Sequence, residues 1–202
     1  MAKNAKSSKL FHTLELEAFR AGITPRTEQS REWFRKRVRD MRGDRINRNN
    51  LMKEEPVTLH DDHIIGAMGM FFYDPKHKEE LPYYDSFPLV IVIGPAKGGF
   101  LGLNLHYLPP ILRAKFLDAL LETLSDNRYN EATKFNVTYQ MLKGVSKMKY
   151  FKPCIKHYLT DHMVSRFGKV HPAEFEIAVF LPTADWQKKT SNQVYKFSRA
   201  MI

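Results

Sequence analysis

The sequence contains several groups of residues whose types could bind metals, and their spacing argues against such a site. Residues 60–63 (HDDH) supply four metal-ligating side chains. Consecutive side chains project in different directions, however, and zinc sites normally draw ligands from separated places. His157 and His162 are five residues apart, whereas a helix needs four to place two imidazoles on one face. We therefore interpret these residues as a solvated linker and the edge of a basic helix.

A thiol nucleophile and a phosphate loop are also suggested by short patterns. Cys154 precedes His157 by three residues, which would activate a thiolate if the segment were helical, although a lone buried cysteine is the simpler interpretation. Residues 94–99 (GPAKGG) are rich in glycine. They lack the order G-x-x-x-x-G-K-[ST] and precede a predicted strand instead of a helix. We expect a tight hairpin turn there.

A nuclease would need two or three converging carboxylates and a lysine around magnesium. The available carboxylates are Asp74, Asp85, Glu174 and Glu176. Their spacing does not specify a nuclease, and Glu176 is expected on the solvent face of a strand. The sequence thus predicts no catalytic residue, no metal or other cofactor, and no enzyme.

Aromatic and basic residues offer a different chemistry. Five aromatic side chains gather in the predicted strand region, where packing is the default and base stacking the alternative: Tyr73, Tyr83, Tyr84, Phe87 and Tyr107. Arginine and lysine neutralise phosphates without reading sequence. We interpret two groups of them as DNA contacts: Arg31, Arg35, Lys36, Arg37, Arg39 and Arg42, and then Lys143, Lys147, Lys149, Lys152 and Lys156.

The distribution of charge along the chain supports this interpretation. Residues 1–53 hold 14 basic and 6 acidic side chains, residues 54–133 hold 6 and 12, and residues 134–169 hold 8 and 1. Two basic blocks thus flank an acidic middle in a chain of net charge +10. Clustered positive charge is typical of a surface that binds nucleic acid, with acidic protein partners as the alternative.

Length and composition limit the class of protein. The 202 residues suffice for one ordinary domain with an extension. The longest apolar run, residues 89–93, is far shorter than the roughly 20 residues that cross a bilayer. The basic N-terminus lacks the apolar region of a secretory signal, and the single cysteine cannot form an internal disulfide. We expect synthesis in a reducing cytoplasm and no membrane contact.

Two helices are predicted in the N-terminal third. Residues 11–20 form a short amphipathic helix that ends before Gly22. Thr24 and Pro25 suggest the cap and first turn of a second helix that continues to Arg42. Residues 43–62 lack periodicity and are interpreted as a linker with at most one turn of helix.

Strands and helices follow in irregular order. Strands are expected from about residue 64, over 88–93 and 100–105 as a core hairpin, and over 176–181. A strong helical pattern begins at Pro109, and weaker ones cover residues 138–147 and 153–167. The sequence predicts an α+β fold, with a small, mostly antiparallel sheet or open barrel packed by helices. Its expected parts are a basic helical arm (1–63), a body (64–185) and a basic tail (186–202).

The segments 81–90 (LPYYDSFPLV) and 99–109 (GFLGLNLHYLP) resemble a virion protein family of T-even-type tailed phages. Residues 113–118, 151–158 and 180–183 extend the resemblance over roughly residues 66–185. Members of this family are often labelled DNA end protectors. The label implies a minor head component that binds the genome's terminus and shields it from a host nuclease. The resemblance supplies no catalytic or end-binding residue to transfer.

The sequence and the resemblance together predict a non-enzymatic virion protein, made in the host cytoplasm, that binds double-stranded DNA near its end. The alternative is a structural neck, tail, baseplate or head-tail connector component that joins other virion proteins. Such a subunit would also be compact and cysteine-poor, with an arm that orders against a neighbour. A homo-oligomer within the virion is left open.

Overall fold

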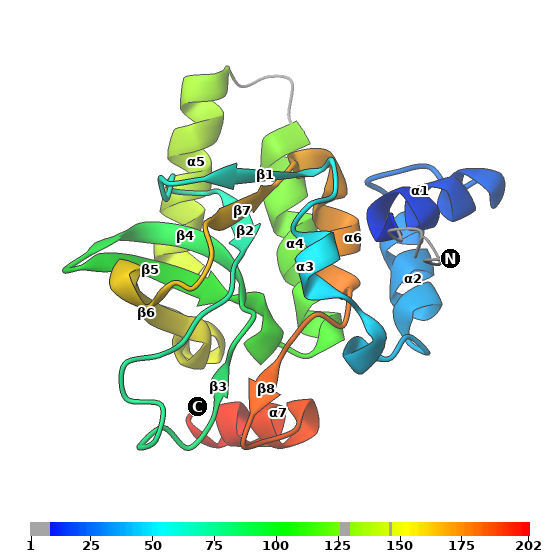
Figure 1. The fold of residues 1–202 in the computed structure, drawn as a ribbon. Helices are drawn as coiled ribbons and strands as arrows, with labels where there is room; N and C mark the ends of the chain where they lie inside the picture. Colours follow the sequence, from blue (N-terminus) through cyan, green and yellow to red (C-terminus); the bar gives the residue numbers. More distant parts are fainter. Residues whose placement is uncertain (1–8, 126–129, 146) are drawn as a thin grey trace.

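The computed structural model describes residues 9–125, 130–145 and 147–202 as an antiparallel sheet covered by helices (Figure 1). In order across the sheet, the strands are β1 (Val57–His60), β7 (Phe167–Val170), β2 (Met68–Met70), β4 (Leu89–Ala96), β5 (Gly99–Asn104) and β6 (Ile155–Leu159). Each neighbouring pair is antiparallel. The predicted α+β class is confirmed. Within the described residues, no helix is long and apolar enough to cross a bilayer.

The β4–β5 hairpin forms the centre of the sheet, as predicted. The first five residues of β4 are buried on both faces, and Gly98 turns the chain with φ of +74°. The register runs from Val90 opposite Asn104 to Ala96 opposite Gly99, with a bulge between Val92 and Gly94. A side chain at Gly99 would collide with the backbone of β6, so glycine there permits the strands to approach.

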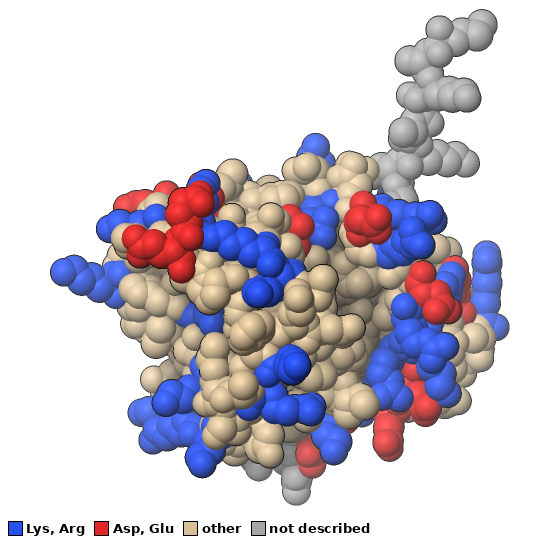
Figure 2. Space-filling model, turned by 90° about the horizontal axis from the view of Figure 1, so that it is seen from below, with Lys and Arg blue, Asp and Glu red and all other residues tan. Residues whose placement is uncertain are grey.

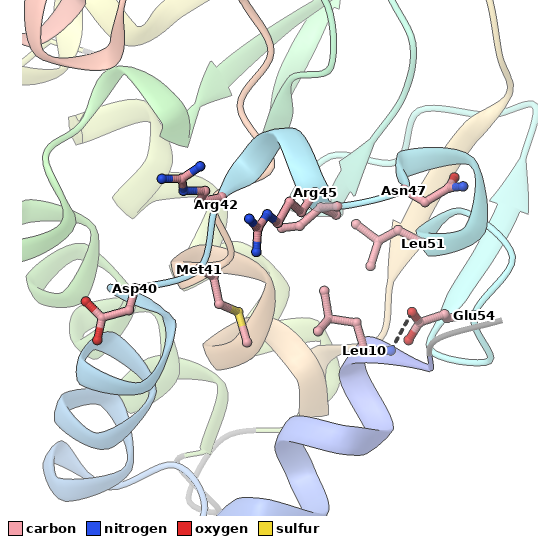
Figure 3. A pocket seen from close by; sticks show the side chains of 9 residues that line it. Leu10, Asp40, Met41, Arg42, Arg45, Asn47, Leu51 and Glu54 are labelled. Carbon is pink, nitrogen blue, oxygen red and sulfur yellow. Dashed lines mark hydrogen bonds between the residues drawn. The ribbon is translucent and has the colours of Figure 1, made fainter. Parts of the chain in front are cut away.

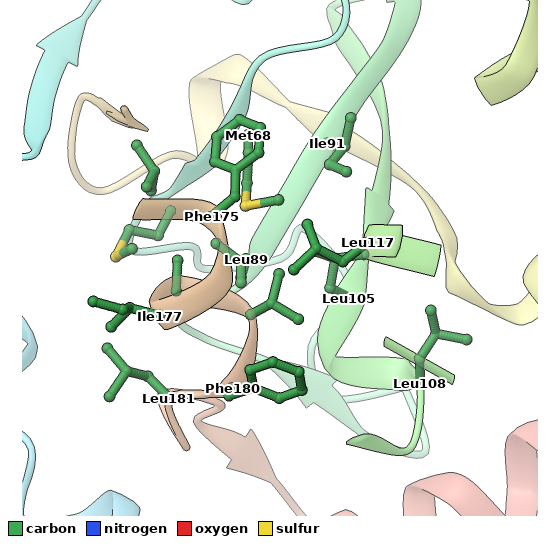
Figure 4. Close-up of a cluster of buried hydrophobic side chains, with 14 of the residues drawn as sticks. Met68, Leu89, Ile91, Leu105, Leu108, Leu117, Phe175, Ile177, Phe180 and Leu181 are labelled. Carbon is green, nitrogen blue, oxygen red and sulfur yellow. The ribbon is translucent and has the colours of Figure 1, made fainter. Parts of the chain in front are cut away.

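Alternate residues of these strands build two apolar clusters, one on each face of the sheet. The larger cluster combines strand residues such as Met68, Leu89 and Ile91 with the helices (Figure 4). The smaller cluster is mostly aromatic and includes Phe71, Phe100, Tyr158 and Phe167. Of the five aromatic side chains weighed for stacking, Tyr73 lies in it, and Tyr83, Phe87 and Tyr107 are buried in the larger one, while Tyr84 is half-buried and belongs to neither. Packing, the default expectation, holds for the four side chains in these clusters.

Three helices cover the larger cluster: α4 (Pro110–Ser125), α5 (Glu131–Val145) and α6 (Phe175–Phe180). The helix beginning near Pro109 is confirmed, but the strand predicted over residues 176–181 is wrong. This apolar run is the helix α6, whose six residues are all buried and which packs against α1, α2 and α4. A short run buried on every side carries no periodicity that separates a strand from a helix.

Helices α1 (Leu10–Arg20) and α2 (Glu28–Val38) pack beside α6 (Figure 1). Helix α1 buries Phe11, Leu14 and Ala18 and is followed by Gly22 at φ of +69°, as expected. The cap predicted at Thr24 is wrong. Thr27 caps α2 instead, because its side chain and that of Ser30 each accept from the other's backbone N–H in a capping box. The helix also ends at Val38, short of Arg42.

Residues 43–62, interpreted as a linker, contain more structure than expected. The 3₁₀ turn η1 (Gly43–Arg45) and the short helix α3 (Arg48–Leu51) lead into strand β1. Strand β1 pairs with β7 at the edge of the sheet, from Val57 opposite Val170 to His60 opposite Phe167. Strand β1 has only four residues, which is too few for a clear alternating pattern. The strand that pairs with it lies more than a hundred residues away, so no local signal indicates the pairing. The division of the chain at residue 63 stays a prediction.

The helix predicted over residues 153–167 is also wrong. The chain there forms the 3₁₀ turn η3 (Lys149–Cys154), edge strand β6 and a further turn, η4 (Thr160–His162). Pro153 lacks the N–H that a helix interior needs, and pairing with β5 organises the next five residues. The last elements are a two-stranded sheet, β3 (Tyr84–Asp85) with β8 (Trp186–Gln187), and helix α7 (Ser191–Ala200).

Candidate nucleic-acid interface

Arg31, predicted as a DNA contact, is engaged inside the protein. Its guanidinium forms ion pairs with Asp118 of α4 and, at 3.3 Å, with Glu176 of α6. Glu176 is 3% exposed and also accepts hydrogen bonds from the Ser30 hydroxyl (2.8 Å) and the Arg26 N–H (2.9 Å). A buried carboxylate needs such partners. Arg31 therefore joins α2 to α4 and α6. The prediction that Glu176 lies on a solvent face is wrong, because this carboxylate is buried among these partners.

Other basic side chains of α2 make exposed ion pairs. Arg37 binds Glu17 of α1 through two hydrogen bonds of 2.5 and 3.0 Å, which hold the pKa of Glu17 below its ordinary value. Lys36 pairs with Glu32 one turn earlier at 2.9 Å. Exposed pairs of this kind contribute only about 0–1 kcal/mol. Exchanging the carboxylate of such an ion pair for a DNA phosphate would therefore cost the protein little stability.

A groove of about 650 Å³ opens beside the last turn of α2. Arg35, Lys36 and Arg39 line one side of it, and the start of α4 and the residues Ser191 and Tyr195 of α7 line the other. None of the described residues that line it is acidic. Helix starts carry partial positive charge, so α4 and α7 add to the attraction for an anion.

Arg113 stiffens the wall of this groove. Its guanidinium donates to the carbonyls of Leu108 (2.7 Å), His106 (3.2 Å) and Val179 (3.2 Å) and to the Tyr195 hydroxyl (2.9 Å). The side chain is 5% exposed, and these four hydrogen bonds fix the position of its guanidinium. It ties the start of α4 to α6 and α7, and so fixes the groove's shape instead of binding freely.

The second basic block divides between packed and exposed side chains. Lys156, on β6, is half-buried, and its ammonium lies 4.2 Å from the ring centre of Tyr107. Burial lowers the pKa of Lys156. Lys143, on α5, lies 6.0 Å from the Tyr139 ring. Lys147, Lys149 and Lys152 are exposed in and just before η3, which makes this turn the most available part of the block.

Helix α7 connects the two basic blocks. It lines the α2 groove through Ser191 and Tyr195, and it also contacts η3. Its ten residues span about 15 Å. Helix α7 itself carries the exposed Lys196 and Arg199. Its capping box, Thr190 with Gln193, is visible in the sequence, but residues 186–202 were interpreted only as a basic tail.

The face that carries α7 thus combines both blocks, which lie more than a hundred residues apart in sequence. Figure 2 views the molecule from this side. Separate groups of lysine and arginine side chains lie across this face and along its edges, with uncharged surface between them, and the aspartate and glutamate side chains lie toward the edges. We call this surface the α7 face, defined by the α2 groove, by Lys196 and Arg199, and by the exposed lysines of η3.

Arg42 does not line this groove, although its chain neighbours Met41 and Gly43 do. Together with Arg45 it lines a smaller pocket of about 280 Å³ between α1, the end of α2 and η1 (Figure 3). Asp40 and Glu54 share that pocket. The carboxylate of Glu54 accepts from the N–H groups of Leu10 (2.7 Å) and Phe11 (2.8 Å), which caps α1. This mixed charge makes the pocket a weaker phosphate site than the groove.

Comparison with models of known protein families gives a match over most of the chain. The model of the family described as phage T4 terminal DNA protecting protein matches residues 12–200. The chain belongs to this family. No curated protein and no solved structure matches it. The resemblance predicted from residues 81–90 and 99–109 is confirmed, and the match extends it to the N-terminal helices and to α7.

Several residues weighed as catalytic have other roles in this protein. Burial raises the pKa of the Cys154 thiol to about 12, so at neutral pH it is not a thiolate nucleophile. His157 is exposed on β6 and bonds the Lys97 carbonyl at 3.0 Å. His63 stacks on Phe100, and Asp61 pairs with Arg166. Among the described residues, no three His, Cys, Asp or Glu side chains gather as a metal site.

The carboxylates considered for a nuclease have different hydrogen-bond and ion-pair partners. Asp74 pairs with Lys78 at 2.9 Å at the surface, and Glu176 is held by Ser30 and Arg31. Glu174, in the turn η5 (Pro172–Glu174), is half-buried, and burial raises its pKa to about 7. Glu174 and Glu176 line one pocket beside Arg26, and repulsion from Glu176 contributes to the raised pKa of Glu174. Asp74 and Asp85 have other partners, so the four carboxylates do not share one site.

A buried Asp–His–Thr chain is the arrangement that sequence reasoning missed. His106 Nδ1 lies 2.6 Å from Asp85 Oδ2, and His106 Nε2 lies 3.1 Å from the Thr183 hydroxyl. The three residues are 0–4% exposed. Burial lowers the pKa of His106 despite the nearby carboxylate. The neutral imidazole therefore donates to Asp85 and accepts from Thr183, linking strand β3, turn η2 (Leu105–Tyr107) and the segment before β8.

Proposed function

We propose that this protein binds the terminus of double-stranded phage DNA through the α7 face and shields it from exonuclease without chemical catalysis. The observation that carries the proposal is the joining of two basic blocks on one face by α7. Membership of the terminal DNA protecting family supports the same conclusion. Arg31 and Lys156 support the fold beneath this face, while the more exposed cations contact phosphate.

The mode of binding follows from the residue types. The interface offers arginine forks and lysine ammonium groups, which bind phosphate oxygens but do not distinguish base pairs. Such binding weakens steeply as salt rises because counterions are released on association. Protection then requires only that the bound protein occupies the terminus that an exonuclease must enter.

Fluorescence anisotropy across a salt series, with a blunt duplex and a closed circle of the same sequence, tests the proposal. We expect tighter binding to the blunt duplex, and slower digestion of that duplex by an end-dependent exonuclease when the protein is present. Equal affinity for both DNAs would overturn end recognition, and no binding at low salt would overturn DNA contact. Cleavage of either DNA by the protein with magnesium would overturn the non-catalytic role.

Copy number in the particle tests where the protein acts. We propose that it resides in the virion at the genome's end, so very few copies per particle are expected. A neck, tail, baseplate or connector subunit, alone or as a homo-oligomer, would instead follow the three-, six- or twelve-fold symmetry of the particle. Quantitative mass spectrometry of purified virions separates these outcomes, and stable complexes with other virion proteins would support the structural alternative.

A further inference from the structure

The lysine-rich segment at η3 also exposes two large side chains that contribute little to the core. Tyr150 is 64% exposed and Met148 is 53% exposed, and Lys147, Lys149 and Lys152 surround them in sequence. Residues 143–160 contain no aspartate or glutamate. An aromatic ring among cations is the combination that binds nucleic acid by stacking and by phosphate contact together.

The backbone beneath Tyr150 is held in place by its neighbours. Pro153 and Cys154 are buried, and the Phe151 ring packs against Phe116 of α4 with 5.5 Å between ring centres. Tyr150 is therefore exposed on an anchored turn, and its ring is presented outward while Phe151 faces the core. Helix α7 contacts η3 and carries the partly exposed Phe197, whose ring lies 6.0 Å from that of Tyr83.

A duplex end differs from the rest of a duplex in one chemical respect. Along the helix each base pair is covered by two neighbours, whereas at a blunt end one face of the last pair is open. Lysine and arginine contacts cannot distinguish an end from the interior, because phosphates line both. An exposed ring can do so, since it stacks on that open face, and stacking tolerates any base.

We propose that Tyr150 stacks on the terminal base pair of the bound DNA, while the flanking lysines hold its last phosphates. This inference rests on the proposed function and adds the feature by which the protein selects an end. The recognised chemistry is the open π-face of a terminal base pair beside a phosphate backbone. Met148, next to the same lysines, widens the apolar contact.

Binding by the wild type, Tyr150→Ala and Tyr150→Phe to blunt linear duplex and to closed circle tests the inference. We expect Tyr150→Ala to weaken binding to the linear duplex roughly five- to 150-fold, the range of one base–aromatic stack, and to leave binding to the circle unchanged. Tyr150→Phe should keep the preference for ends. Phe19→Ala removes an aromatic side chain on α1 that is 80% exposed, and serves as the matched control.

A second measurement reads the stack directly. A duplex with 2-aminopurine at its last base pair should change fluorescence on binding wild type but not Tyr150→Ala, and an internal 2-aminopurine should respond to neither. If the wild type prefers ends and Tyr150→Ala keeps that preference, the stacking inference is wrong while the proposed function stands. If the wild type shows no preference for ends, the proposed end-binding function is wrong, and the stacking inference that rests on it is wrong as well.

Discussion

Asp85 shows what a buried charged residue requires in this protein. Its carboxylate accepts from His106, from the Asn104 amide (3.2 Å) and from the N–H groups of Phe87 (3.1 Å) and Asp185 (3.0 Å). Burial alone would raise its pKa, but His106 and the other donors lower it below the ordinary value. The side chain is thus an ionised hub that joins β3, the β4–β5 hairpin and the chain before β8.

Replacing this hub should strongly destabilise the protein. Asp85→Ala removes the acceptor of four donors, three of them buried, so we expect the free energy of unfolding to fall by about 3 kcal/mol or more. Urea denaturation followed by circular dichroism measures the change. Asp61→Ala removes an exposed carboxylate paired with Arg166 and should cost less than about 0.5 kcal/mol. An unchanged urea midpoint for Asp85→Ala would contradict the assigned role.

Glu174 should make stability depend on pH. Burial, with repulsion from Glu15, raises its pKa from 4.5 to about 7 in the folded protein. The folded state therefore holds this proton more tightly than the unfolded state, and stability is lost as pH rises from about 4.5 to about 7. Glu174→Gln should raise Tm near pH 8 and change it little near pH 4. Equal shifts at both pH values, or a shift for the exposed control Glu55→Gln, would contradict this.

The environment of a side chain could be predicted only where it depends on residues nearby in the sequence. The cationic character of η3 is evident from its composition, and the packing of the aromatic side chains was the expected default. The Asp85–His106 pair was missed because 21 residues and a complete hairpin separate its members. Similarly, nothing near Glu176 in sequence indicates that Ser30 and Arg31 will enclose it.

Among the elements, α2 offers a direct test of where a helix begins. Thr27 accepts from the Ser30 N–H at 3.1 Å, whereas the prediction placed the cap at Thr24. Thr27→Ala should lower the free energy of unfolding by about 1 kcal/mol, the usual cost of losing such a cap. Thr24→Ala is the matched control, because only its backbone carbonyl bonds to Thr27. A larger loss of unfolding free energy for Thr24→Ala than for Thr27→Ala would support a helix that begins at Thr24, as predicted from the sequence.

Elements with a local pattern were predicted, and elements defined by distant partners were not. The β4–β5 hairpin has a β-branched run and a glycine turn, and α4 has a long 3.6-residue apolar repeat. Strands β1 and β6 are edge strands whose neighbours β7 and β5 supply the hydrogen bonds. Helix α6 is buried by α1, α2 and α4, so its apolar residues show no exposed face to reveal a period.

For the whole molecule, the expected division into arm, body and tail can be tested by truncation. Phe11, Leu14 and Phe34 belong to the same buried cluster as the sheet and α6, and β1 completes the sheet edge. Each buried side chain of this size contributes about 1.5–3 kcal/mol, against a typical total stability of about 5–15 kcal/mol. We therefore expect a chain that begins at residue 64 not to unfold cooperatively. A sharp thermal transition for it would show that residues 64–202 fold without the arm.

The proposal that one DNA duplex spans both basic blocks is a property of the whole molecule, and its salt dependence tests it. Each lysine or arginine that contacts phosphate adds about one to the slope of log K against log salt. Arg39→Ala and Lys149→Ala come from opposite ends of the α7 face, so each should lower the slope by about one and the double variant by about two. Lys97→Ala removes an exposed lysine in the turn between β4 and β5 and should leave the slope unchanged. If only one block bound DNA, one of the single variants would match the wild type, and the double variant would lose no more than the other.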